Sequence, residues 1–237
     1  MRIVALSDQH GCMPEVPPCD LLLVAGDICP DRVRDTVAMF QPQVQSAWFD
    51  RMIRPWIAAS PARHRVTTWG NHDWCGQACD YSADAPARAS TTTLQIVVDG
   101  LTRVPSDDST QAADITIWAT PWSIAFGDWA FMKTPAELAT EYARIPEGID
   151  ILMSHQPPYG YGDLVTDLSG DRVHVGSPEL LAAIERVRPR LVVCGHIHAG
   201  HGRYEHQGVP IYNVSVVDER YRNVHEPTVI ELPTGGR

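Results

Sequence analysis

The sequence predicts an α/β protein in which helices cover a sheet or a pair of sheets. Short apolar runs rich in β-branched residues have the length of buried strands, and amphipathic stretches with helical spacing lie between several of them. This alternation is typical of layered α/β folds. The predicted strands are 3–6, 21–25, 66–69, 94–98, 115–119, 151–153, 191–194, 211–214 and 229–232.

Three helices are predicted between these strands. One apolar stripe lies between residues 44 and 56, and a shorter helix is predicted over 135–144. The third helix begins at Ser177, Pro178 and Glu179, which suit an N-cap, a first helical residue and a first-turn acid.

The remaining segments are predicted to be hairpins and long loops. Because strands outnumber helices, we expect meanders over 94–119 and 204–232. The loops 28–43, 74–92 and 156–176 are long enough to have a functional role.

Length and composition suit one globular domain spanning 1–237. The 237 residues are 44% hydrophobic and 20% charged, and a net charge of −10 disfavours long nucleic acids as partners. The apolar runs are too short to cross a membrane, and nothing resembling a leader precedes Asp8, so a cytoplasmic location without membrane contact is predicted. In that compartment the six cysteines are expected to be free thiols. The sequence predicts no oligomeric state.

Polar patterns follow five of the predicted strands, at the point where each strand ends. In chain order they are Asp8-Gln9-His10, Gly26-Asp27, Gly70-Asn71-His72-Asp73, Ser154-His155 and Gly195-His196-Ile197-His198. Because ligands of α/β sheets bind at the carboxyl ends of strands, one crevice can collect all five patterns.

The residue types in these patterns indicate a pair of metal ions. Divalent cations such as Mn²⁺, Fe²⁺ and Zn²⁺ accept mixed imidazole and carboxylate ligands. A bridging carboxylate can hold two cations about 3.5–4 Å apart, a spacing suited to in-line displacement at phosphorus. The two rings of a His-x-His pair can reach different metals if the backbone turns between them.

These patterns, in this order, resemble the calcineurin-like metallophosphoesterase superfamily. Within that superfamily, the chain is similar to the subgroup of metallophosphoesterase domain-containing proteins, which are class III cyclic-nucleotide-phosphodiesterase-like. The similarity lies in Thr120-Pro121-Trp122, in Trp129-Ala130-Phe131 and in the prolines after His155. The resemblance implies a two-sheet sandwich flanked by helices. It also implies a first metal on Asp8, His10 and His198, a second on Asn71, His155 and His196, and Asp27 as the bridge.

The same resemblance places His72 beside the substrate rather than on a metal. A protonated His72 would hydrogen-bond the phosphate or protonate the leaving oxygen, while Asn71 would neutralise phosphoryl charge. The acidic partner that keeps His72 charged is Asp73 or Asp31. We therefore expect His72, Asp73 and Asn71 to be the catalytic residues.

Four further side chains are candidates for substrate contact. Trp74 follows the Asn71 pattern, and Tyr159 and Tyr161 follow the prolines after His155. His174 lies in the 156–176 loop. Loop packing is the alternative for the aromatic residues, and a surface position is the alternative for His174.

The predicted function is hydrolysis of small phosphodiesters, such as cyclic or other nucleotides, by attack of a metal-bound hydroxide. Two divalent ions are the predicted cofactors, with Mn²⁺ favoured and Fe or Zn²⁺ as alternatives. A phosphomonoesterase for nucleotides or other small phosphates is one alternative function. A non-catalytic binding module on the same fold is the other.

Overall fold

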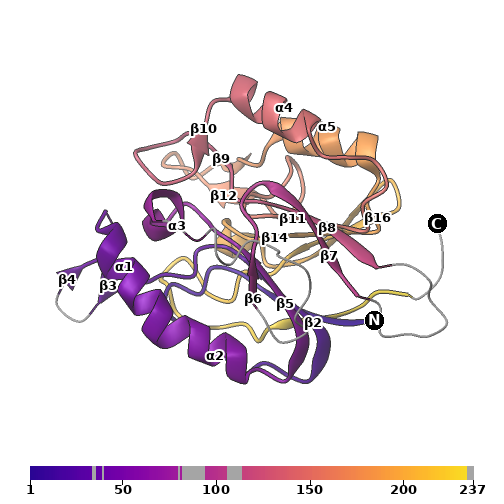
Figure 1. Cartoon of the computed structure of the whole chain (residues 1–237). Helices are drawn as coiled ribbons and strands as arrows, with labels where there is room; N and C mark the ends of the chain where they lie inside the picture. The colour runs from indigo at the N-terminus through magenta and orange to yellow at the C-terminus, as the bar shows by residue number, and fades with distance from the viewer. Residues whose placement is uncertain (34–35, 39, 80, 82–93, 106–113, 234–237) are drawn as a thin grey trace.

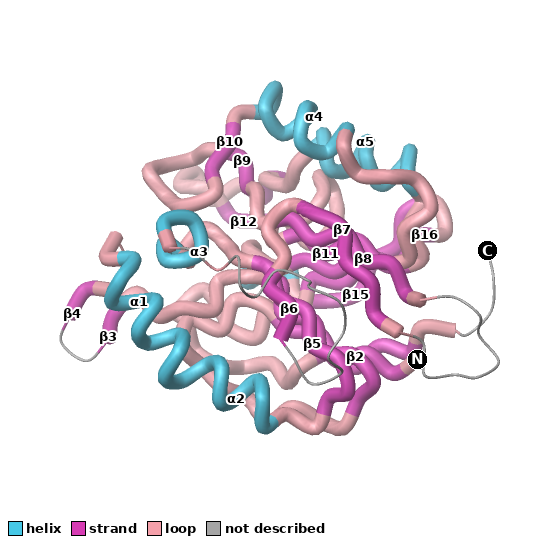
Figure 2. Tube along the Cα trace, in the orientation of Figure 1, coloured by secondary structure: helices cyan, strands magenta, loops and turns pink. Residues whose placement is uncertain are grey.

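Two β-sheets pack face to face between two layers of helices (Figure 1). This arrangement is seen in a computed structural model that describes the chain except residues 34–35, 39, 80, 82–93, 106–113 and 234–237. Figure 2 shows the strands lying between the helices α1 and α2 on one side and α4 and α5 on the other. The predicted α/β class and the two-sheet sandwich are both confirmed.

The first sheet is mostly parallel and carries three of the predicted site patterns. Its strand order is β17 (Thr228–Glu231), β1 (Arg2–Leu6), β2 (Cys19–Ala25), β5 (Ala62–Thr68) and β6 (Leu94–Ile96). Only β17 runs antiparallel, at the edge beside β1. Because β1, β2 and β5 are parallel, the residues after them emerge along one edge.

The second sheet has a parallel centre with an antiparallel strand at each edge. Its order is β15 (Gly202–His206), β16 (Val209–Asn213), β14 (Leu191–Cys194), β11 (Ile151–Ser154), β8 (Ile115–Thr120) and β7 (Gly100–Val104). Strands β8, β11, β14 and β16 are parallel, and hairpins join β7 to β8 and β15 to β16. The patterns after β11 and β14 therefore share an edge too.

Side-chain alternation along the strands separates the core into layers. Ile3 and Ala5 of β1 face the second sheet, where they pack with Ile117 and Met153. The alternate residues Val4 and Leu6 face the opposite way, toward the α1–α2 layer. This period-two pattern buries both faces of each sheet, which explains why the strands read as continuous apolar runs.

One helical layer is a single rod with an irregular centre. α1 (Pro42–Trp48), a π-helical turn (Phe49–Ile53) and α2 (Arg54–Ala59) follow without a break. Pro55 has no N–H to donate to the preceding turn, and the π-helical turn lies directly before it. The guanidinium group of Arg65 caps the end of α2 by donating to the carbonyl oxygens of Ile57 and Ser60, at 2.8 and 2.7 Å.

The other layer contains α4 (Pro135–Ala143) and α5 (Pro178–Val187), as predicted. Thr134 and Glu137 form a reciprocal capping box at the start of α4. Ser177 caps α5 by accepting a hydrogen bond from the backbone N–H of Leu180. The short helix α3 (Trp74–Ala78) follows the loop after β5 and lies against α1.

The two predicted meanders are wrong in part. β6 pairs with β5 in the first sheet, whereas β7 and β8 form a hairpin in the second. Likewise β15 and β16 form a hairpin, but β17 crosses to the first sheet and pairs with β1. Local alternation identifies a strand without identifying the sheet that it joins, since the long-range partner decides that.

The predicted loops contain short paired strands. β3 (Arg32–Val33) pairs with β4 (Thr36–Val37), and β12 (Leu164–Thr166) pairs with β13 (Arg172–His174). Between them in the chain, β9 (Ser123–Ile124) pairs with β10 (Met132–Lys133). Most of the 74–92 loop lies outside the described residues.

Two predictions from composition can be checked against the fold. All six cysteines are free thiols, as expected. In the part of the chain that the structure describes, no helix combines the length and apolar character needed to cross a membrane.

Candidate dinuclear metal site

The five polar patterns lie together where the carboxyl ends of the two sheets meet. The backbone N–H of Asp8 donates to the carbonyl of Gly26 at 3.0 Å, which joins the loops after β1 and β2. The N–H of Gly195 donates to the carbonyl of His155 at 2.9 Å, which joins the loops after β14 and β11. A bridge between Ser7 and Ser215 connects the two sheets at the same end. The crevice predicted from the sequence is therefore present.

Strained backbone is concentrated at this edge. Asp8, His10, Asp27 and His196 have φ values of 56°, 43°, 51° and 68°, in the left-handed region that non-glycine residues seldom adopt. Such conformations persist where surrounding contacts determine them, and they gather at functional sites. Here each one turns a polar side chain into the crevice directly after a strand.

Two glycines allow the loops to approach these side chains. A Cβ atom on Gly70 would overlap the carboxylate of Asp27, and one on Gly195 would overlap the side chains of Ser7 and Asp8. The sequence placed both glycines beside predicted ligands, and close approach of backbone to side chain is their physical function.

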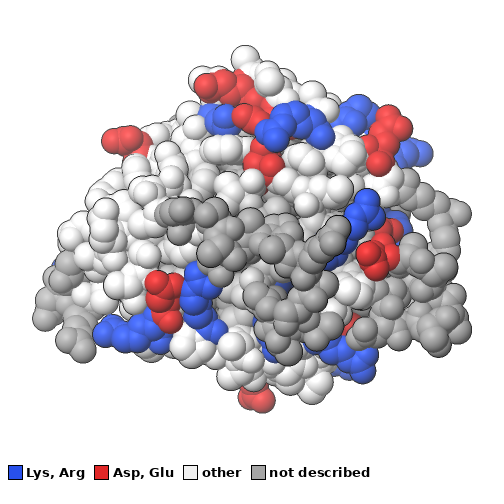
Figure 3. Space-filling model, in the orientation of Figure 1, with Lys and Arg blue, Asp and Glu red and all other residues white. Residues whose placement is uncertain are grey.

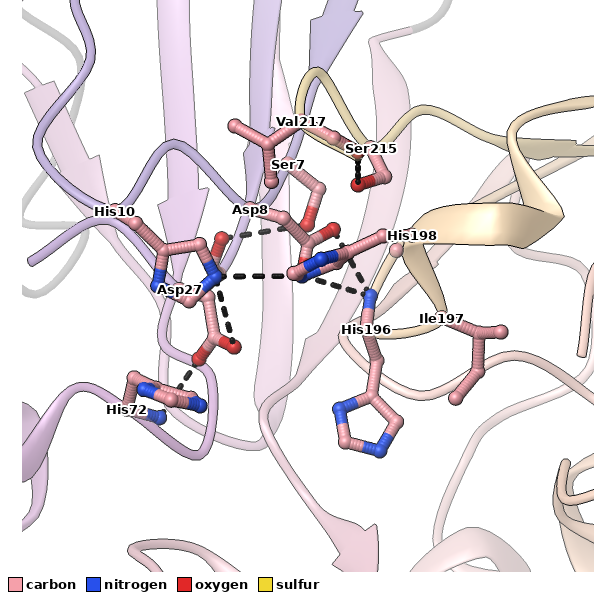
Figure 4. Close-up of polar contacts among 12 residues, drawn as sticks. Ser7, Asp8, His10, Asp27, His72, His196, Ile197, His198, Ser215 and Val217 are labelled. Atoms are coloured by element: carbon pink, nitrogen blue, oxygen red, sulfur yellow. Dashed lines mark hydrogen bonds and ion pairs between the residues drawn. The ribbon is translucent and has the colours of Figure 1, made fainter. Parts of the chain in front are cut away.

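The first group of predicted ligands comprises Asp8, His10 and His198. Their ligand atoms all lie within 4.8 Å of one another, and the facing Nε2 atoms of His10 and His198 are 3.4 Å apart (Figure 4). Nδ1 of His198 lies 3.0 Å from the carbonyl oxygen of Asp218, so Nδ1 is the donor and Nε2 is directed into the site. The carboxylate of Asp8 accepts the backbone N–H of His196 at 2.9 Å, which fixes the loop that carries His196 and His198.

The second group comprises Asp27, His155 and His196, whose ligand atoms also lie within 4.8 Å of one another. Nδ1 of His155 donates to the carbonyl of Ala25 at 2.9 Å, and its Nε2 lies 2.9 Å from Oδ1 of Asn71. Asn71 is thus at the position predicted for it beside the second group.

Asp27 lies between the two groups. Its Oδ2 is 3.8 Å from Nε2 of His10 and 3.3 Å from Nε2 of His155. Its other oxygen accepts the backbone N–H of His72 at 2.7 Å, which fixes the carboxylate orientation. One carboxylate oxygen facing both groups is the arrangement that a bridging ligand requires.

The electrostatics of the site suit cations. Burial lowers the pKa of both His10 and His196 to about 3, so these rings are neutral at pH 7 with nitrogen lone pairs available. Burial alone would also lower the pKa of His155, but the Asp27 carboxylate raises it to about 9. Since a ligand histidine binds metal in its neutral form, metal binding would displace that proton.

His72 is held beside the two groups by a carboxylate and an indole. Its Nδ1 lies 2.7 Å from Oδ1 of Asp31, and its ring stacks on Trp129 at a centroid distance of 4.3 Å. Burial would lower the pKa of His72, yet Asp27 and Asp31 together raise it to about 9. Of the two acids that the sequence left open, Asp31 is the one that contacts the ring.

Asp73 lies behind the site rather than in the pocket. Its buried carboxylate accepts backbone N–H groups of Ile28, Cys29 and Gly70 at 2.8 to 3.0 Å. These bonds tie the loop after β2 to the loop after β5, which positions Asp27 and Asn71 relative to each other. Among the hydrogen bonds of the described residues, none joins the Asp73 carboxylate to the ring of His72.

Asp31→Asn is expected to shift the alkaline limb of the pH–rate profile to lower pH. The role predicted for His72 requires its protonated form, so activity should fall as pH rises through its pKa. A carboxylate in contact raises a histidine pKa by about 1–3 units, and the neutral amide removes that effect. The measurement is kcat/KM against pH for the wild type and the variant. An unchanged alkaline limb would contradict the pairing.

A pocket of about 720 Å³ opens over the site, and aromatic side chains form much of its wall. Tyr159 and His174, both predicted as substrate contacts, are among the described residues that line it. Trp74 and Tyr161 are not among them. Trp74 packs on Phe40 at 5.2 Å, and the Tyr161 hydroxyl bonds Nδ1 of His206 at 2.7 Å.

Three aromatic residues of the pocket lining were not predicted from the sequence. Trp129 stacks on His72, Phe126 lies 5.6 Å from the ring of His196, and Tyr221 lies 4.6 Å from the ring of His10. Aromatic residues in loops carry no ligand-type signal in a sequence.

Comparisons with known proteins agree with this geometry. The chain is 29% identical to human "Metallophosphoesterase domain-containing protein 1" over 98% of its own length and 71% of that protein. It is 26% identical to a UPF0046 protein of Caenorhabditis elegans, covering 98% of this chain and 81% of that one. The solved phosphopantetheinyl hydrolase of Mycobacterium tuberculosis shares the fold with a TM-score of 0.53 and 14% identity, over 92% of this chain and 90% of that one.

The family assignment follows from the extent of the match together with the site. The sequence model of the calcineurin-like phosphoesterases matches residues 1–200, a range that contains every predicted metal ligand. The chain belongs to the calcineurin-like phosphoesterase family.

Proposed function

We propose that this protein hydrolyses small phosphodiesters, cyclic and other nucleotides among them, with two divalent cations and preferably Mn²⁺. The observation that carries the proposal is the position of Asp27, whose Oδ2 faces His10 on one side and His155 on the other. A carboxylate so placed could be shared by two cations, and in-line displacement at phosphorus uses such a pair.

The residues present fit two cations. Asp8, His10 and His198 would hold one ion, Asn71, His155 and His196 the other, and Asp27 would contact both. The Nε2 atoms of His10 and His198 lie 3.4 Å apart, close enough for both rings to reach one cation. Bound cations of this kind supply an activated water and neutralise charge on phosphoryl oxygens.

The chain's own residues supply orientation and a proton. The Asn71 amide nitrogen would donate to a phosphoryl oxygen, while its carbonyl oxygen lies near His155. Protonated His72, anchored through Nδ1, has Nε2 available to protonate the leaving oxygen. Asp73 acts as a positioning residue through the loops that it joins.

The pocket wall favours a diester over a monoester. No lysine or arginine is among the described residues that line it, and Phe126, Trp129, Tyr159 and Tyr221 give it aromatic surfaces. A monoester near neutral pH brings up to two negative charges and a diester only one. A wall with few cations therefore suits the less charged substrate and an organic group on each side of phosphorus.

Long nucleic acids remain disfavoured as substrates. The net charge is −10, and on the face shown in Figure 3 the described basic and acidic side chains lie interspersed rather than in a basic patch. The cytoplasmic location, the single-domain organisation of 1–237 and the identity of the metal stay predictions.

An activity panel with Mn²⁺ tests the proposal. We expect kcat/KM for bis(p-nitrophenyl) phosphate and for a 2′,3′- or 3′,5′-cyclic nucleotide to exceed that for p-nitrophenyl phosphate by at least about tenfold, a difference of about 1.4 kcal/mol in transition-state binding. A monoester preference of similar size would instead identify a phosphomonoesterase. Absence of turnover with every ester in the metal-loaded protein would favour the non-catalytic alternative.

A further inference from the structure

A second histidine of the pocket is held by a buried carboxylate, as His72 is held by Asp31. Nδ1 of His174 lies 2.7 Å from Oδ1 of Asp163, a residue that is 0% exposed. The other carboxylate oxygen accepts the backbone N–H groups of Gly160 and Gly176, each at 2.9 Å. The carboxylate is fixed by bonds on both oxygens, and it fixes the imidazole ring in turn.

The ring of His174 presents its remaining nitrogen to the pocket. His174 ends β13, its side chain is 39% exposed, and it is part of the pocket lining. Because an ionised carboxylate only accepts hydrogen bonds, Nδ1 is the donor and Nε2 is left for a ligand. Within the described part of the chain, Nε2 has no hydrogen-bond partner.

An aromatic face lies beside this nitrogen. The ring of Tyr159 is 5.4 Å from that of His174, inclined at 54°, and Tyr159 is 45% exposed where it lines the pocket. The backbone N–H of Tyr159 donates to the carbonyl oxygen of Ser177 at 3.1 Å, which joins the segment that carries Tyr159 to the residues just after His174. One wall of the pocket therefore combines the flat ring of Tyr159 with Nε2 of His174, whose orientation Asp163 fixes.

We propose that His174, together with Tyr159, determines specificity by binding a heteroaromatic ring, such as a nucleobase, carried by the phosphodiester. The proposal rests on the proposed function, because it assigns the organic group of the ester to this wall and the phosphorus to the metal groups. Asp163 is a positioning residue that acts through His174.

The chemistry of a purine fits this wall. Adenine has an exocyclic amino group that donates to a neutral Nε2 and ring nitrogens that accept from a protonated one. Its face can stack on Tyr159, and stacking of a base on an aromatic side chain is substantial and tolerant of base identity. A flexible acyl or polyol group offers neither the flat face nor this pattern of donors and acceptors.

The test compares two ligands that differ only in the base. Calorimetry on the full-length, Mn²⁺-loaded chain measures Kd for adenosine 5′-monophosphate and for ribose 5-phosphate. We expect the wild type to bind the nucleotide at least about tenfold more tightly. In His174→Ala the nucleotide Kd should rise about tenfold, while the Kd of ribose 5-phosphate and the metal content stay unchanged.

A matched control and a second variant accompany this measurement. His206 also pairs with a carboxylate, since its Nε2 lies 2.9 Å from Oε1 of Glu185, but it is outside the described pocket lining. His206→Ala should keep wild-type affinities for both ligands. Tyr159→Ala should weaken only the nucleotide, and it provides an independent test if His174→Ala fails to fold in a melting experiment.

The outcomes separate this inference from the proposed function. Equal wild-type affinity for the two ligands would overturn the inference, and so would an equal loss for both in the folded variant. If the nucleotide is recognised through His174 but no diester is hydrolysed, the inference stands and the proposed function fails. If diesters are hydrolysed but the two ligands bind equally, the proposed function stands and the inference fails.

Discussion

Asp27→Ala is expected to remove metal binding and activity together. Oδ2 of Asp27 lies within 4 Å of ligand nitrogens from both metal groups, because it faces His10 and His155. Without it each group retains fewer anionic ligands, and the two cations lose their common one. We expect kcat/KM to fall by at least about 10³-fold, because loss of a single group that stabilises transition-state charge already costs 10²–10³.

The measurement is metal content by elemental analysis together with kcat/KM, on protein whose folding is checked by circular dichroism. Asp27→Asn is the informative companion, because the amide keeps an oxygen to accept the N–H of His72 but lacks the negative charge. Asp50→Ala is the control, since Asp50 is an exposed carboxylate of the helical rod that pairs with Arg54. Two metals per chain in folded Asp27→Ala would show that the residue is not the bridge.

The folding check on Asp27→Ala is needed because Asp27 is a buried carboxylate with histidine partners. Burial acts to raise the pKa of Asp27, but His155 and His72 outweigh it and hold that pKa well below its usual range. Removing one partner of a buried ion pair leaves the other charge uncompensated, so Asp27→Ala is expected to lose some stability as well as its metals. The core layers on either side are formed by the apolar residues of β2 and do not include Asp27.

The positions of the predicted ligands followed from sequence because parallel topology makes strand ends converge. Asp8, Asp27 and Asn71 each follow a strand of the first sheet, and His155 and His196 each follow one of the second. An apolar run that ends in a ligand-type residue is visible in the sequence. The parallel pairing that brings such ends together is a strong property of α/β sheets.

Features that depend on loop path were not accessible in the same way. The segment from Asp27 to Asp31 bends so that Asp31, rather than the adjacent Asp73, contacts His72. Trp129 reaches His72 because the backbone N–H of Ala130 donates to the carbonyl of Asn71 at 3.1 Å. Contacts of this kind join residues far apart in the chain through turns whose geometry the local sequence leaves open.

His72→Ala is expected to lower turnover by about 10²–10⁴-fold while leaving two metals bound. The backbone N–H of His72, which orients Asp27, is unaffected by the loss of the ring. Metal content is the decisive control, because the ligand atoms of His72, His10 and Asp31 also lie within 4.8 Å of one another. If the variant loses metal, His72 is a ligand and its proposed role beside the substrate is wrong.

The leaving group separates the two ways in which His72 can act on the phosphate ester. If His72 protonates the leaving oxygen, its loss should slow a cyclic nucleotide, which expels an alkoxide, much more than bis(p-nitrophenyl) phosphate, which expels a stable phenolate. If it only binds a phosphoryl oxygen, both substrates should slow by the same factor. Trp129→Ala should give the same substrate pattern with a smaller loss, because it removes the surface that stacks on the imidazole while Asp31 still holds Nδ1. A larger effect on the nitrophenyl ester than on the cyclic nucleotide would contradict proton donation by His72.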